Sequence, residues 1–362
     1  MACALRLRGI ARLRHDPPDE ALAEASFRRA LALYRELGDV EGVATMLNDL
    51  AYRVSRPSES IAALQEAHEL AHDAGETHAL AMISGSLALL LLYCSGSYAA
   101  AHAAAEQSVA GHEATGFTWQ GANTSLILAE ACLTLGDATS ATAVARRALD
   151  LGSQFQGGAA AAIRGGAHAI LGNAARLRGE RDAHEHYRTA LRMLRAANRN
   201  ETAAWARVMS LDGLARIARA QDRPAAMRDL ADEALAHLAS FEPSGSYFMP
   251  AALRLTCRVR LGEAFVLEGE HEPAERHLHE TLSLARAWGA HPRSWRPCSR
   301  WGSSVAAKGG RPRRATSCGS WRATRPVRSR SRDARRTRCN AYRRPRRIRA
   351  DRPCRSTNCW LP

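Results

Sequence analysis

The 362-residue chain is poor in aromatic side chains, which make up 6% of it. They are too few and too scattered for the base stacking that single-strand nucleic-acid binding uses. No apolar run reaches the length expected of a membrane-spanning helix, and arginines interrupt residues 1–14, so no secretory signal is expected. A cytoplasmic location is therefore the default expectation. The cysteines of the first 290 residues occur singly and predict small buried thiols: Cys3, Cys94, Cys132 and Cys257.

The motifs of common enzyme classes are also missing. Lys308 lacks the glycine and the Ser/Thr of a P-loop, and neither Gly-x-Gly-x-x-Gly after a strand nor Gly-x-Ser-x-Gly occurs. His184 and His186, like His277 and His279, are two residues apart, which places each pair on different helix faces as solvated residues and not as joint metal ligands. We expect no enzyme, no cofactor and no metal site.

Charge divides the chain into two parts. Residues 291–362 contain 22 Lys and Arg and only two acidic residues, whereas residues 1–290 contain 29 basic and 34 acidic residues. The formal net charge of +15 therefore arises entirely in the last fifth of the sequence. Each part needs its own interpretation.

Residues 1–290 are rich in alanine and leucine, which recur on a fixed grid. In one copy, Leu128-Ala129 is followed by Cys132, the turn residue Gly136, and then Ala141, Ala145 and Ala148-Leu149. Seven copies follow one another at intervals of roughly 38–47 residues, and their leading pairs are Ile10-Ala11, Leu50-Ala51, Ala88-Leu89, Leu128-Ala129, Leu171-Gly172, Leu214-Ala215 and Leu261-Gly262.

Each copy predicts two helices joined by a tight turn. The apolar residues three and four apart form one helix face, and Gly136, Gly179 and Gly269 suit the left-handed residue that ends a helix. Alanines on the second helix allow a close crossing. Because one pair cannot bury its apolar face alone, successive pairs must stack.

The grid resembles the tetratricopeptide repeat (TPR) in its Leu-Gly pair, turn glycine, following alanine and final Ala-Leu, although the repeats are longer and lack the terminal proline. The resemblance implies an all-α, right-handed α-solenoid of antiparallel helix pairs, a TPR-like superhelix of seven pairs over residues 1–290. A more distant resemblance, to the sensor arms of bacterial signal-transduction ATPases that regulate transcription, lies in the segment of residues 30–51, ALALYRELGDVEGVATMLNDLA. That predicts an ATPase or DNA-binding module encoded upstream and in frame.

Residues 291–362 have three interpretations: a nucleic-acid-binding arm, a disordered solvated tail, or an eighth repeat read in a shifted frame. Reading each codon one base early turns Trp and Cys codons into apolar residues and most Arg and Pro codons into Ala in GC-rich DNA. Such a reading of 294–324 restores the grid 40 residues after Leu261. We favour the shifted frame, which makes this a poorly ordered tail without evolved function, and sequencing the DNA around codons 288–300 tests it.

The first helices of TPR proteins line a concave groove, and polar residues on that face are the expected binding residues. We therefore predict a protein-interaction scaffold that binds a protein or a peptide in this groove. Self-association is left open. The alternative, a nucleic-acid-binding protein acting through the basic tail, requires a steep salt dependence of binding. The predicted groove residues are Asn48, Glu130, Asn173, Arg176, Asp212, Arg216, Arg219 and Glu263.

Overall fold

A computed structural model describes residues 1–13, 19–51, 57–197, 200–240 and 248–288. All described residues lie in one compact unit, which falls within Met1–Gly310. The predictions for the basic tail, including the shifted repeat, therefore lie outside the described residues.

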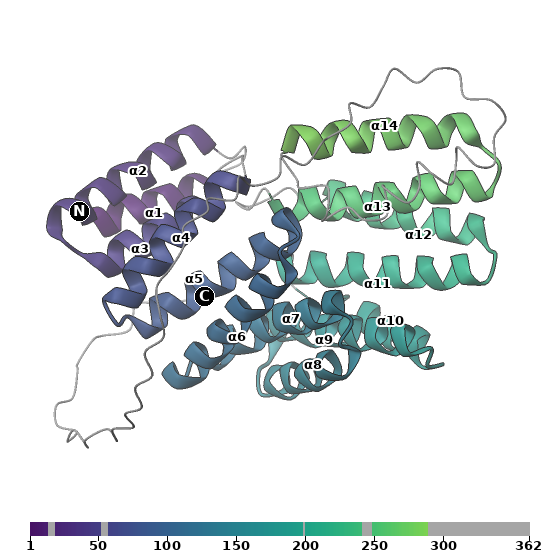
Figure 1. Ribbon diagram of the computed structural model, residues 1–362, viewed down its shortest axis with the longest axis horizontal. Coiled ribbons are helices and arrows are strands. Elements are labelled where there is room, and N and C mark those ends of the chain that lie inside the picture. Colours follow the sequence, from purple (N-terminus) through teal and green to yellow (C-terminus); the bar gives the residue numbers. More distant parts are fainter. Residues whose placement is uncertain (14–18, 52–56, 198–199, 241–247, 289–362) are drawn as a thin grey trace, which may run out of the picture. The chain divides into compact units, whose positions relative to one another are not determined.

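The described residues form fourteen α-helices and a π-helical turn, and no strand occurs among them (Figure 1). The all-α prediction is confirmed. The elements are α1 (Ala2–Leu13), α2 (Glu20–Leu37), α3 (Val40–Ala51), α4 (Pro57–Asp73), α5 (Thr77–Leu90), η1 (Leu91–Ser95), α6 (Tyr98–Thr115), α7 (Thr118–Leu135), α8 (Ala138–Ser153), α9 (Gly157–Arg178), α10 (Ala183–Met193), α11 (Glu201–Ala220), α12 (Pro224–Ser240), α13 (Phe248–Leu267) and α14 (His271–Trp288).

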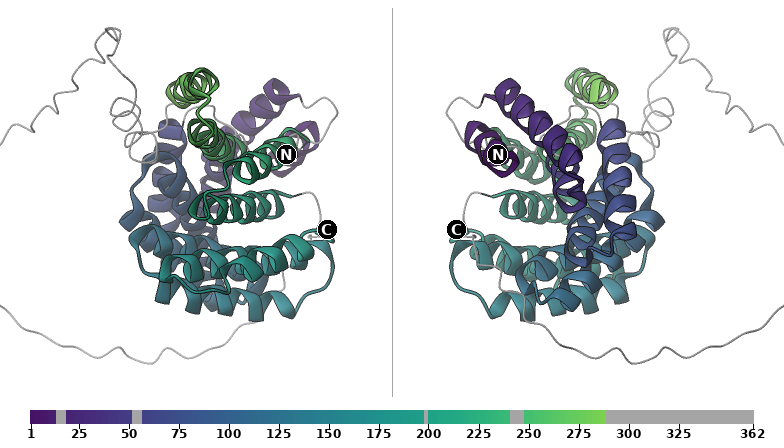
Figure 2. Two further views of the ribbon diagram at one scale, coloured as in Figure 1. Left: turned by 90° about the vertical axis from the view of Figure 1, so that its right-hand side faces the viewer. Right: turned by 90° about the vertical axis from the view of Figure 1, so that its left-hand side faces the viewer.

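The helices pack as seven consecutive antiparallel pairs, which follow one another in chain order (Figure 2). Each odd-numbered helix from α3 to α11 also contacts the next odd-numbered helix. We call the odd-numbered helices from α3 to α13 the inner helices. In addition, α13 contacts η1, many residues earlier in the chain. The layer of inner helices therefore curves back on itself, and side chains from distant repeats meet there.

The grid residues form the core between paired helices. Ala141, Ala145 and Ala148 of α8 are fully buried. Phe27 and Tyr187, which take the place of Ala145 in their own copies, are fully buried as well. Tyr187 fits because Gly213 has no side chain: a Cβ there would lie 2.2 Å from the ring. Close packing of this kind resists changes of volume.

Glycines end helices where the grid placed the turns. Gly136 has φ of 88°, Gly179 of 73° and Gly269 of 82°, all in the left-handed region that a Cβ disfavours. After the first of these, the Asp137 side chain accepts a hydrogen bond from the Ser140 amide and caps α8. Sequence and structure agree at these helix ends.

Two expectations need correction. Thr77–Ser95, spanning α5 and η1, is long and apolar enough to cross a membrane by length and composition alone, but 61% of that window is buried inside the protein, as in a core helix. Of the four cysteines expected to be buried, Cys94, Cys132 and Cys257 are buried, whereas Cys3 is exposed.

Candidate functional site

All eight predicted groove residues lie on inner helices, but they do not form one site. Asn48 is on α3, and no described contact joins it to the others. Glu130 on α7 belongs to a pocket, described below. The remaining six lie on α9, α11 and α13, where buried arginine and tyrosine side chains bring them together.

The first cluster is an ion network between α11 and α13. Asp212 accepts hydrogen bonds from Arg216 Nε at 2.6 Å and from Arg260 Nε at 2.5 Å. Arg260 also donates from Nη1 to Glu263 Oε2 at 2.5 Å, and Arg219 Nη1 lies 3.9 Å from the same carboxylate. We call these five residues the arginine network. Asp212, Arg260 and Glu263 are buried, so two carboxylates and one guanidinium satisfy one another away from water.

Electrostatics in the arginine network favour the ionised carboxylate. Burial alone would raise the pKa of Asp212, but the charges of Arg260 and Arg216 and their hydrogen bonds lower it below its usual value. Arg216 and Arg219 extend from this buried centre toward solvent, and the Arg219 side chain is 53% exposed. The network thus combines a buried ion cluster with cationic groups at its rim.

Asn173 and Arg176 adjoin this network through Tyr187 of α10. The Tyr187 hydroxyl donates to Asn173 Oδ1 at 2.9 Å, deep in the packing between α9 and α10. The charges of Arg176 and Arg216 lower the pKa of Tyr187, although burial raises it more. Asn173 is therefore engaged with the core of its own helix pair.

The second cluster surrounds Glu130. Trp205 Nε1 of α11 lies 3.0 Å from Glu130 Oε2 and 2.5 Å from the Tyr93 hydroxyl of η1. The Tyr93 hydroxyl donates to the same carboxylate oxygen. Burial raises the pKa of Glu130 to about 7, although these two hydrogen bonds act in the opposite direction. A carboxyl group that changes charge near neutral pH therefore sits where three repeats meet.

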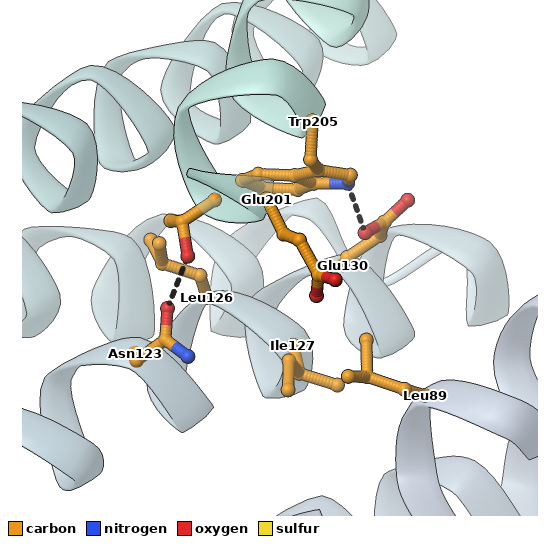
Figure 3. Close-up of a pocket in the computed structure, with 8 residues that line it drawn as sticks. Leu89, Asn123, Leu126, Ile127, Glu130, Glu201 and Trp205 are labelled. Atoms are coloured by element: carbon orange, nitrogen blue, oxygen red, sulfur yellow. Dashed lines mark hydrogen bonds between the residues drawn. The ribbon is translucent and has the colours of Figure 1, made fainter. Parts of the chain in front are cut away.

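A cavity of about 110 Å³ lies against this carboxyl group, and we call it the Glu130 pocket (Figure 3). Its walls mix apolar and polar side chains, and Thr202 Oγ1 donates to Asn123 Oδ1 at 3.0 Å. Such a mixture gives a site both affinity and orientation. The lining residues come from α5, α7 and α11: Leu89, Asn123, Leu126, Ile127, Glu130, Glu201, Thr202 and Trp205.

No family model matches the sequence, and no curated protein matches it. Among solved structures, the apo form of RapI is similar with a TM-score of 0.58 and 14% identity, covering 79% of this chain and 98% of RapI. A Rap protein complexed with Competence and Sporulation Factor is 15% identical over 79% of this chain and 87% of its own, with a TM-score of 0.45. The quorum sensor NprR from B. thuringiensis, in apo form, is 12% identical over 76% of this chain and 86% of its own, with a TM-score of 0.42.

The fold is TPR-like. At 14% identity the RapI match establishes the architecture alone, and it confirms the α-solenoid of helix pairs that the grid predicted. The inner helices of this TPR-like solenoid are the first helices of the second to the seventh pair. All eight predicted residues thus lie on the expected layer, and their role in binding stays a prediction.

Three important residues were not predicted as site residues. Trp205 is buried between helices, and its indole nitrogen also donates a hydrogen bond to Glu130. Tyr93 stands in an apolar stretch, and Arg260 comes directly before the Leu261-Gly262 pair, and neither belongs to a recognisable motif. Arg260 offered one signal, because a buried position in an apolar helix face rarely carries arginine unless an acid pairs with it.

Two of the four histidines expected on solvated surface are half-buried. The His277 ring of α14 stacks on the Phe265 ring, with ring centroids 5.2 Å apart. His186 was expected on solvated surface, but it is half-buried, with Nδ1 3.2 Å from Nδ1 of His168 on α9. Burial and the neighbouring charge of His186 lower the pKa of His168. Within the described ranges, no group of three or more metal-ligating side chains forms.

Proposed function

We propose that this chain is a protein-interaction scaffold that binds a segment of a partner protein on its inner helices, with the Glu130 pocket receiving one side chain. The main observation behind this proposal is the pocket itself, whose lining residues come from the inner helices of three repeats. Leu89, Leu126 and Ile127 supply apolar walls, while Asn123 and Thr202 supply polar groups. A pocket of about 110 Å³ suits a single side chain better than a whole metabolite.

A finer role, the regulatory arm of a larger bacterial transcriptional regulator in the cytoplasm, forms part of the same proposal. Its support is the sequence resemblance of the segment from Ala30 to Ala51 to sensor arms of signal-transduction ATPases. The TPR-like fold is compatible with that role, because solenoids present extended binding surfaces.

Selection of binding peptides tests the scaffold function. A random peptide library is panned on the full chain, and the recovered peptides are measured by fluorescence polarisation on two variants. Asn123→Trp fills the Glu130 pocket. Ala143→Trp places the same side chain at an exposed position on α8, one of the even-numbered helices, which we call the outer helices.

The first variant is expected to weaken binding by about 10-fold or more, since a hot-spot pocket is lost, and the second to leave it unchanged. Hydrogen exchange of the bound chain should protect α5, α7 and α11. Peptides that bind both variants equally, with protection confined to outer helices, would refute the proposed function.

A further inference from the structure

We propose that the partner segment places a basic side chain, lysine or arginine, in the Glu130 pocket. This inference rests on the proposed function and specifies the chemistry of its partner. It follows from the charge and the shape of the pocket, which are independent observations.

The charge observation concerns buried acids. Glu130, Asp212 and Glu263 are the buried carboxylates among the described residues, each with at most 7% of its surface exposed. Asp212 and Glu263 each have arginine partners. For Glu130, the described partners are the neutral donors Tyr93 and Trp205. A buried carboxylate without a cation is costly, and an incoming cation would offset that cost.

The shape observation concerns the walls. The indole of Trp205 lies opposite Leu89 and Ile127, and the carboxylate of Glu201 points between them (Figure 3). Lysine and arginine have an apolar stem that packs on such walls and a charged head. Trp is the most favourable aromatic ring for a cation. An acidic side chain would meet two carboxylates here, and an apolar one would leave Glu130 without a cation.

Proton linkage makes the inference measurable. The groups that face Glu130 are Tyr93 from η1 and Trp205 and Glu201 from α11, and Asn123 also lines the pocket. Burial raises the pKa of Glu130 to about 7. Binding of a cation favours the ionised form, so at pH 7 each bound segment should release about half a proton.

The probe is a set of capped seven-residue peptide pools, random except for a fixed central residue: Arg, Lys, citrulline, norleucine or Glu. Binding to the full chain is measured by fluorescence polarisation, and proton release by calorimetry in two buffers of different ionisation enthalpy. Glu130→Gln keeps an oxygen that accepts from Tyr93 and Trp205 but removes the charge. Glu36→Gln, at an exposed position on α2, makes the same change in net charge elsewhere.

The Arg and Lys pools should bind about 10- to 100-fold more tightly than the citrulline and norleucine pools, and Glu130→Gln should remove both this preference and the proton release. Glu36→Gln should preserve both. Pools that bind the inner helices without preference, or a preference that survives Glu130→Gln, would overturn this inference and leave the scaffold function standing. Absence of binding to the inner helices by every pool would overturn the proposed function itself.

Discussion

The Glu130 pocket and the arginine network are both built from buried carboxylates on inner helices, yet their electrostatics are opposite. In the arginine network, Arg260 and Arg216 hold the pKa of Asp212 below its usual value. In the pocket, burial raises the pKa of Glu130 to about 7, and the hydrogen bonds from the neutral donors Tyr93 and Trp205 lower it only in part. The network is complete within the chain, whereas the pocket lacks a cation among its described partners. The comparison contrasts a structural ion cluster with the pocket that we propose as a recognition site.

The largest effect is expected on breaking the arginine network. Asp212→Ala leaves Arg260 buried with Glu263 as its remaining partner among the described residues, and should lower the free energy of unfolding by about 3–5 kcal/mol. Urea unfolding followed by circular dichroism measures this change. A loss below about 1 kcal/mol would show that the network is not a structural cluster.

The second effect separates the two carboxylates by pH. The folded-state pKa of Glu130 is raised from 4.5 to about 7, so its contribution to stability is complete below pH 4.5 and is lost as pH rises through 7. As pH rises from about 4 to about 8, the free energy of unfolding of Glu130→Gln should therefore increase by up to about 3 kcal/mol relative to that of the natural chain.

Asp212→Asn should show the reverse dependence. The folded-state pKa of Asp212 is lowered from 3.8, so its contribution is present above that pH and is lost as pH falls through the lowered value. Urea unfolding across the pH range measures both variants. If the free energy of unfolding of the two variants changed with pH in the same way, the contrast between the Glu130 pocket and the arginine network would be wrong.

A third, smaller effect is expected from Tyr93→Phe. Loss of the hydroxyl removes a donor to the Glu130 carboxylate, which should cost about 1 kcal/mol and raise the pKa of Glu130 further. The pH midpoint of the Glu130-dependent stability change should move upward. Tyr34→Phe on α2 serves as the control. An unchanged pH midpoint in Tyr93→Phe would mean that the hydrogen bond from Tyr93 does not influence the pKa of Glu130.

The smallest effect is expected at the rim of the arginine network. The Arg219 guanidinium is half exposed and 3.9 Å from Glu263, so Arg219→Ala should change the free energy of unfolding by less than about 0.5 kcal/mol. Thermal unfolding at low and high salt measures it. A change as large as that of Asp212→Ala would place Arg219 among the buried members of the network.

Much of the fold follows from local spacing. Ala145 and Tyr187 are buried because three- and four-residue intervals place them on the apolar face of their helices, and Gly136 ends α7 because only its backbone takes the left-handed conformation easily. These are properties of one helix pair, which the sequence encodes directly.

The candidate functional site can be predicted from the sequence only in part. Periodicity placed Glu130, Asp212 and Glu263 on the inner helices. It does not determine how each helix pair is rotated relative to the next, and this rotation brings Tyr93 and Trp205 together although they are 112 positions apart in the sequence. Arg260 is likewise 48 positions from Asp212. Contacts between repeats depend on how the pairs stack, and for this reason the partition into a pocket and a network was not predicted.

The most direct test is a carbon-13 NMR titration of the Glu130 side-chain carboxyl, assigned with Glu130→Gln, in the full chain with and without a saturating Arg-centred peptide pool. The free chain should titrate near pH 7, and the bound chain at least two pH units lower, about 100-fold in proton affinity. A midpoint near 4.5 in the free chain, or one that bound peptide leaves unchanged, would contradict the assignment of this pocket to a basic side chain.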